Sequence, residues 1–297
     1  MSITAIILTF NEEQHIQRCI DSLKPCVERI CVIDSGSSDA TIEIARRLGA
    51  EIYENPWVSY AAQFQWALDT CDIDTPWTLR IDADERLSLA LQSEMTDRLP
   101  TLAPETTGVH APRLTVFMGQ PIRHGFFYPS PMLRLWRTGV GRIENQWMDE
   151  HIVLDHGKTV HFKGDLIDEN LNDIGWWTEK HNRYADREAR DQLLRRSGAG
   201  GGEAARLRGG AAVKRFLKLR VYERLPATFR PFAYVFARYV FGLGVLDGKE
   251  GFYFHVLQGF WYRTLVEAKV LELKKNASAD PGAAARPLPA HKTPSAE

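Results

Sequence analysis

Short apolar, β-branched runs alternate with helix-like stretches along the first hundred residues of the chain. The runs are nearly continuous in apolar residues, as in strands that are buried on both faces. Such alternation is typical of βαβ units, which build a parallel sheet flanked by helices. We expect strands at 3–8, 30–33, 51–53 and 77–81, and helices at 12–23, 40–48 and 60–69. The sequence therefore predicts an α/β fold with a Rossmann-like, mostly parallel sheet.

Polar residues end three of these apolar runs, at 9–12, 34–39 and 82–85. In open α/β sheets, ligands bind beyond the carboxyl ends of the strands. The three polar clusters are therefore expected to meet at one edge of the sheet and to form one binding site.

Asp82 and Asp84 directly follow the strand expected at 77–81 and are separated by one residue. Hard divalent cations such as Mg²⁺ or Mn²⁺ prefer carboxylate oxygens and complete their shell with phosphate oxygens and water. A cation at this position would neutralise a diphosphate and make a nucleotide a better leaving group. Acidic pairs after strands also occur in solvated turns, but the position in the α/β half favours a metal site.

Asp34 ends the second strand and begins a glycine-containing turn that leads into a helix. Ser38 or Asp39 is well suited to cap that helix, because their side chains accept hydrogen bonds from helix N-terminal amides. Capping does not account for Asp34, whose carboxylate is placed to bond the base or ribose of a nucleotide.

Three motifs in this order resemble those of the inverting family 2 glycosyltransferases, which have a GT-A fold. They are IILTFNEE at 6–13, VIDSGSSDAT at 32–41 and RIDADE at 80–85. The resemblance implies a GT-A sheet and transfer of a sugar from a nucleotide donor, with UDP-hexose expected. It also implies Mg²⁺ or Mn²⁺ held mainly through Asp84, with Asp82 beside it.

The same resemblance implies the residues that bind the nucleotide sugar. Asp34 is expected on the uracil or ribose side, and Gln65 stands where an Asn is usual in the family. The implied set is Thr9, Asn11, Glu12, Asp34, Gln65, Arg80 and Asp82.

An inverting transfer needs one general base, which deprotonates the acceptor hydroxyl as it attacks the anomeric carbon. The run WMDEH at 147–151 resembles the His-Glu element of lipopolysaccharide-core members, with Asp149 where His is usual. Glu150 is therefore predicted as the base, with Asp149 as the alternative and a surface acidic turn as the non-catalytic interpretation. Arg134 is interpreted either as an anion contact or as a salt-bridge partner within the fold.

A second composition begins near Trp176, with helical spacing, many arginines and a low-complexity run at 197–202. A basic run at 214–220 precedes an aromatic-rich stretch to about residue 273. Within this stretch, FGLGVLDGKEGF at 241–252, followed by Tyr262 and AKVLE at 268–272, is similar to the tail of enzymes that modify the lipopolysaccharide inner core. Basic and aromatic residues together suit an anionic membrane surface, although a helical cap that packs on the catalytic domain is the alternative. We expect a catalytic domain at 1–165 (donor half 1–90, acceptor half 91–165), a helical region at 166–275 and a disordered tail at 276–297.

Composition narrows the possible partners. The net charge of −1 argues against nucleic acid, and the four cysteines show neither zinc spacing nor a disulfide framework. The chain is expected to be cytoplasmic and peripheral on the inner face of the membrane, with a lipid-anchored glycan as acceptor. Two alternatives stay open: a polyprenyl-phosphate sugar synthase, and a non-catalytic nucleotide-sugar-binding protein.

Overall fold

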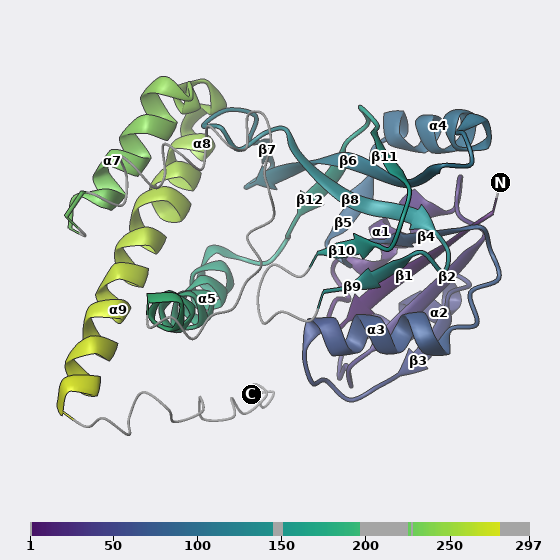
Figure 1. The fold of residues 1–297 in the computed structure, drawn as a ribbon, viewed down its shortest axis with the longest axis horizontal. Helices are drawn as coiled ribbons and strands as arrows, with labels where there is room; N and C mark the ends of the chain where they lie inside the picture. The colour runs from purple at the N-terminus through teal and green to yellow at the C-terminus, as the bar shows by residue number, and fades with distance from the viewer. Residues whose placement is uncertain (1, 145–150, 197–224, 227, 280–297) are drawn as a thin grey trace. The chain divides into compact units, whose positions relative to one another are not determined.

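The computed structural model describes residues 2–144, 151–196, 225–226 and 228–279 (Figure 1). They fall into two compact units. The first comprises Met1–Leu171 and Gly242–Phe252, and the second comprises Asn172–Phe241 and Tyr253–Glu297. The division expected from the sequence, with a catalytic domain at 1–165, a helical region at 166–275 and a tail at 276–297, remains a proposal.

The first unit is built on a ten-stranded sheet. Its path runs β3 (Glu51–Glu54), β2 (Arg29–Asp34), β1 (Ile3–Thr9), β4 (Trp77–Arg80), β8 (Ser130–Arg137), β6 (Thr106–Phe117), β12 (Leu166–Glu169) and β5 (Glu85–Leu87). The first four strands are parallel, whereas β8 is antiparallel to both of its neighbours. The short strands β7 (Gln120–Pro121) and β11 (Lys158–His161) pair with β6, and β9 (Gly141–Ile143) pairs separately with β10 (Ile152–Leu154). The prediction of a mostly parallel α/β sheet is confirmed.

Helices cover the sheet through two apolar clusters. The helices of this unit are α1 (Ile16–Leu23), α2 (Thr41–Arg47), α3 (Tyr60–Thr70) and α4 (Leu89–Arg98), followed by the 3₁₀ turn η1 (Leu99–Thr101). Ile7 of β1 packs in the cluster that contains the buried face of α1, whereas Ile6 packs in the cluster of α3 around Phe64. Successive side chains of a strand point to opposite faces. A strand that is apolar throughout therefore packs against helices on both faces of the sheet.

Helix α1 begins at Ile16, so the expected start at residue 12 was wrong. The amides of His15 and Ile16 both donate to the carbonyl of Glu12, which forms a turn before the helix. The amide of Glu12 donates to Thr41 Oγ1 at 2.7 Å. Residues 12–15, which were expected to be helical, therefore form a turn that contacts the segment after β2.

The second unit is helical, as expected for this region. It contains α5 (Ile174–Arg196), α7 (Arg230–Phe236), the π-helical turns η3 (Ala237–Phe241) and η5 (His255–Trp261), and α9 (Tyr262–Ala279). Between the two parts of this unit come η4 (Gly244–Asp247) and α8 (Gly248–Phe254). Helices α5 and α9 share a core that includes Ala185, Ala189 and Val266. None of the helices in the described ranges is long and apolar enough to cross a membrane.

Candidate donor and metal site

The carboxyl ends of β1, β2 and β4 lie at one edge of the sheet, because these strands are parallel. Thr9 ends β1 opposite Asp34, which ends β2, and Thr9 Oγ1 donates to Asp34 Oδ1 at 3.0 Å. Asp82 follows β4, the neighbour of β1 on its other side. The polar clusters identified in the sequence therefore share one edge of the sheet.

Asp34 is fully buried and stabilises the loop that follows it. Its carboxylate accepts from the amides of Gly36 and Ser37 at 2.8 and 2.7 Å, and from Ser37 Oγ at 2.5 Å. Gly36 has a φ of 90°, a backbone conformation that glycine adopts without steric cost. In this structure Asp34 shapes the loop, and its contact with a nucleotide stays a prediction.

The loops after β1 and β2 are joined by side-chain to backbone hydrogen bonds. Asn11 donates its amide to Ser37 Oγ at 2.9 Å and accepts from the amide of Ser38 through Oδ1, also at 2.9 Å. Its φ of 55° is uncommon for a non-glycine residue, although Asn tolerates it better than most. Asn11 therefore fixes the distance between two loops of the predicted donor site.

Glu12 is connected to the end of β12 through His15. Glu12 Oε2 lies 2.7 Å from His15 Nδ1, and the amide of Leu171 donates to His15 Nε2 at 2.9 Å. Because a backbone amide only donates, Nε2 is the acceptor and Nδ1 carries the proton that is donated to Glu12. This contact orients the Glu12 carboxylate, which is only partly buried.

Asp82 is held by polar side chains from α3 and β8. Its Oδ1 accepts from the Tyr60 hydroxyl at 2.6 Å, and its Oδ2 accepts from Arg134 Nη2 at 3.2 Å. Arg80 donates from Nε to the Tyr60 hydroxyl at 2.9 Å and stacks over the Tyr60 ring. Burial alone would raise the pKa of Asp82, but the guanidinium groups of Arg134 and Arg80 and the Tyr60 hydroxyl hold it well below its usual range.

Arg134 also pairs with Glu85, and both side chains are almost completely buried. Glu85 Oε1 accepts from Arg134 Nη2 at 2.7 Å, and Glu85 Oε2 accepts from the amide of Asp82 at 2.9 Å. Burial raises the pKa of the Glu85 carboxyl to about 8, against the opposing effect of Arg134. The salt-bridge interpretation of Arg134 is the one that this structure contains. Sequence reasoning assigned no role to Tyr60 or Glu85, since each lies far along the chain from Arg134.

Removing Arg134 is expected to destabilise the first unit strongly. Arg134→Ala leaves the buried Glu85 carboxyl without its cation, and above the Glu85 pKa of about 8, where this carboxyl is ionised, breaking a buried pair in this way costs about 3–5 kcal/mol. Urea denaturation should show this loss. The matched control is Arg142→Ala, because Arg142 and its partner Asp155 are both more than half exposed, and exposed pairs contribute at most about 1 kcal/mol. Equal, small losses in the two variants would contradict the stabilising role of Arg134.

Asp84 differs from Asp82, because its side chain is partly exposed. Its Oδ2 accepts from Asn170 Nδ2 at 3.0 Å. Within the described ranges, no three or more His, Cys, Asp or Glu side chains are grouped to hold a metal ion. Mg²⁺ in nucleotide sites needs only one or two carboxylates, since phosphates and water complete its shell. The carboxylate of Asp84 fits such a site, whereas that of Asp82 is already bonded on both oxygens.

Helix α3 carries two glutamines in different environments. Gln65 is half-buried and donates to Asp69 at 2.9 Å within its own helix. Gln63 is fully buried, donates to Ser35 Oγ at 3.1 Å and accepts from the Asn55 side chain. Gln63 therefore supports the loop after β2, while a donor contact by Gln65 stays a prediction.

Glu150, the predicted base, lies outside the described residues, and so does its alternative Asp149. The flanking residues are described on either side. The amide of Glu144 donates to the carbonyl of His151 at 2.9 Å, where β9 and β10 pair. The two ends of this segment are therefore close together in space.

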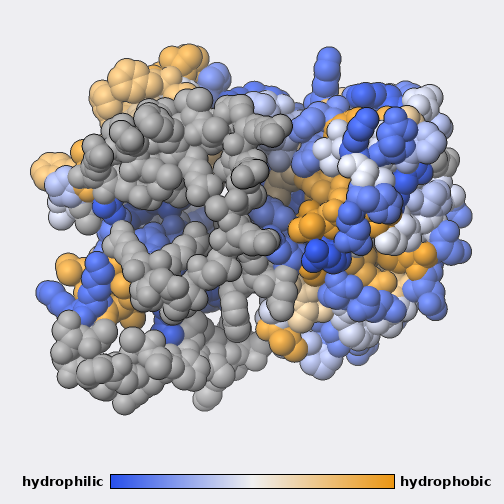
Figure 2. All heavy atoms as spheres, viewed as in Figure 1, coloured by the Kyte–Doolittle hydropathy of each residue, from blue (hydrophilic) through white to orange (hydrophobic). Residues whose placement is uncertain are grey.

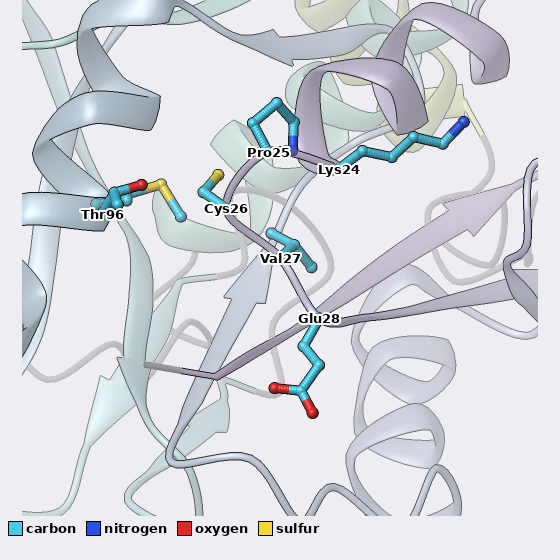
Figure 3. A pocket seen from close by; sticks show the side chains of 7 residues that line it. Lys24, Pro25, Cys26, Val27, Glu28 and Thr96 are labelled. Atoms are coloured by element: carbon cyan, nitrogen blue, oxygen red, sulfur yellow. The ribbon is translucent and has the colours of Figure 1, made fainter.

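A shallow pocket lies between the end of α1 and helix α4 (Figure 3). Its lining includes Lys24, Glu28 and Met95. Residues 24–28 lead into the amino end of β2, so this pocket lies at the edge of the sheet opposite Asp34. It is not part of the candidate donor site.

Comparison with known proteins identifies relatives of this chain. The model of glycosyl transferase family 2 matches residues 4–98. The lipopolysaccharide core biosynthesis glycosyltransferase LpsC of Rhizobium meliloti is 33% identical over 207 residues, which cover 65% of this chain and 72% of LpsC. An uncharacterized glycosyltransferase of Rickettsia felis is 45% identical over 93 residues, 31% of this chain and 32% of that protein.

Solved structures resemble the chain more distantly. Glucosyl-3-phosphoglycerate synthase from Mycobacterium tuberculosis, in complex with Mn²⁺, UDP and glucosyl-3-phosphoglycerate, is 22% identical. The TM-score is 0.31, and the matched region covers 37% of this chain and 43% of the synthase chain. A TM-score this low supports no inference about ligands. The match to LpsC, together with the family model and the parallel sheet, is sufficient: the chain belongs to glycosyltransferase family 2, with its GT-A fold, and is a glycosyltransferase.

Proposed function

We propose that the chain is a metal-dependent inverting glycosyltransferase that moves a hexose from UDP to a hydroxyl of a lipopolysaccharide core or another lipid-anchored glycan. The observation that carries this proposal is the Asp82–Asp84 loop at the carboxyl edge of the sheet. There Asp82 is fixed by Tyr60 and Arg134, and Asp84 is left partly exposed beside it. The similarity to LpsC, a lipopolysaccharide core biosynthesis glycosyltransferase, supports the choice of a lipopolysaccharide core as acceptor.

The chain's own residues have separate roles in this proposal. Asp84 holds the cation, and Asp34 and Asn11 shape the loops that receive the nucleotide. A bound divalent cation neutralises the diphosphate and makes UDP a better leaving group. Glu150 takes the proton of the acceptor hydroxyl, the hydroxyl oxygen bonds to the anomeric carbon, and the bond from that carbon to the β-phosphate oxygen breaks.

The test is a screen of UDP-sugars and other nucleotide sugars against lipopolysaccharide with a truncated core, read by the mass of the product. A mass increase of one hexose supports the proposal. Two further arms separate the alternatives. Transfer to a polyprenyl phosphate instead would identify a lipid-phosphate sugar synthase. Binding of UDP-sugars without transfer or hydrolysis in the presence of Mn²⁺ would identify a non-catalytic binding protein.

We further propose that the chain works at an anionic membrane surface. Apolar side chains gather on the part of the second unit that contains α7 (Figure 2). Phe229, Phe232, Phe236 and Val240 are exposed and follow a helical spacing of three or four residues. The exposure of this apolar stripe supports contact with a membrane interface. The basic run at 214–220 lies outside the described residues.

The basic run is expected to contribute to reversible binding of anionic liposomes. Each basic residue near an anionic surface contributes about 1 kcal/mol, and apolar side chains add to this by insertion. The wild-type chain should therefore float with anionic liposomes at low salt and less at high salt. A variant with Ala at Lys214, Arg215, Lys218 and Arg220 should float less. If the wild type does not float with anionic liposomes at low salt, the membrane proposal fails.

A further inference from the structure

Residues 242–252 are separated from the rest of the first unit by about seventy positions of sequence, yet they pack with it. Their sequence is GLGVLDGKEGF. Gly244 and Asp247 are buried in this segment. A Cβ on Gly251 would lie 2.3 Å from Cβ of Asp247, so the backbone approaches Asp247 too closely for any other residue at 251.

Asp247 binds one loop of the first unit with both of its carboxylate oxygens. Oδ1 accepts from the amide of Arg123 at 3.1 Å and lies 2.7 Å from His124 Nδ1. Oδ2 accepts from the amide of His124 at 3.1 Å. The amide of Gly125 donates to the carbonyl of Gly242 at 2.7 Å. Three consecutive amides of the loop are therefore held by this segment, which lies beside the loop after β7 (Figure 1).

The loop at 122–128 lies at the catalytic edge of the sheet. It leads into β8, which is antiparallel to β4 with Leu135 opposite Leu79. The start of β8 therefore lies beyond the carboxyl end of β4, where Asp82 and Asp84 follow. Further along β8, Arg134 contacts Asp82 directly. Loop 122–128 and the Asp82–Asp84 loop therefore lie toward the same edge of the sheet, on the neighbouring strands β8 and β4.

The held loop has a strained and exposed tip. Phe126 has a φ of 58°, a left-handed conformation that costs free energy in any residue with a side chain. Its side chain is 63% exposed, so burial of the ring does not compensate for this cost. On its other side the loop is fixed by Tyr128, whose hydroxyl donates to Asp165 Oδ1 at 2.7 Å. Strain of this kind persists where surrounding contacts impose it, and it concentrates at ligand sites.

We propose that Asp247 is a positioning residue that holds loop 122–128 in shape, so that Phe126 presents its ring to a sugar ring of the acceptor glycan. The inference rests on the proposed function, because it assigns the acceptor side of the same site. An aromatic face packs on the apolar face of a sugar ring without fixing its charge or hydroxyl pattern. In this proposal, the segment at 242–252 supports the acceptor side of the site through Asp247.

The first test compares Phe126→Ala with Phe126→Tyr, with truncated-core lipopolysaccharide as acceptor. Loss of the ring should raise the acceptor KM about five- to tenfold, the effect of losing one aromatic contact. KM for the UDP-sugar and the melting temperature should stay near wild type, and Phe126→Tyr should behave as wild type. The control is Leu89→Ala, which removes an exposed apolar side chain on α4. An unchanged acceptor KM in Phe126→Ala overturns the inference.

The second test addresses Asp247→Asn, which keeps the shape but replaces one acceptor oxygen with a donor. Hydrogen exchange at the amides of Arg123, His124 and Gly125 should become faster, with exchange in β1 unchanged, and the acceptor KM should rise as in Phe126→Ala. Unchanged exchange at these amides overturns the positioning role. If Asp247→Asn does not fold, the Phe126 variants still decide the question. A wild-type chain that transfers no sugar overturns the proposed function itself, which is distinct from transfer that is insensitive to Phe126.

Discussion

Asp84→Asn is expected to lower the turnover number about 10³-fold, because a metal ion contributes several kcal/mol of charge stabilisation to such a transition state. Asp84 accepts a hydrogen bond from Asn170 through one oxygen. An Asn side chain has only one oxygen, so if it keeps this bond it presents an NH₂ group to the cation. Asp82 cannot readily substitute, since both of its oxygens are bonded to Tyr60 and Arg134.

The measurement is steady-state turnover, with calorimetry of Mn²⁺ binding in the presence of UDP as a second readout. Binding of Mn²⁺ should weaken in Asp84→Asn while the melting temperature stays near wild type. Asp97→Asn is the matched control, because Asp97 is an exposed carboxylate on α4 that accepts a hydrogen bond from the Ser93 hydroxyl. Full activity of the wild type after exhaustive treatment with EDTA would show that the transfer needs no metal.

Glu150→Gln is expected to lower transfer about 10²–10⁴-fold, the usual effect of removing a general base. The amide of Gln has nearly the shape of the carboxylate but does not accept the proton of the acceptor hydroxyl. Because the base acts on the acceptor, calorimetric binding of UDP with Mn²⁺ should stay close to that of the wild type.

Asp149→Asn is the natural comparison, since it changes the neighbouring carboxylate in the same way. Loss of transfer in Asp149→Asn with normal transfer in Glu150→Gln would assign the base to Asp149. Normal transfer in both variants would indicate a nucleophile that is already ionised, as in transfer to a lipid phosphate.

The local sequence was sufficient for the strands and helices of the donor half. Apolar runs without alternation predicted the parallel strands β1, β2 and β4, because a strand buried on both faces needs apolar residues at every position. The position of Asp34 and Asp82 after these runs predicted a shared edge, because parallel strands end on the same side. The start of α1 was predicted four residues too early, since the loop contact of Glu12 with Thr41 joins two elements that lie apart in the sequence.

The sequence by itself determined the α/β sheet, the family and the shared edge at which Asp34 and Asp82 lie, because these depend on periodicity and on short motifs. Only the tertiary structure decided which side chains hold that edge. Arg134 reaches Asp82 and Glu85 across about fifty positions, and Asp247 reaches the loop at 122–128 across more than a hundred. Such contacts depend on how strands and loops pack in three dimensions, and neither hydrophobic periodicity nor local spacing carries that information.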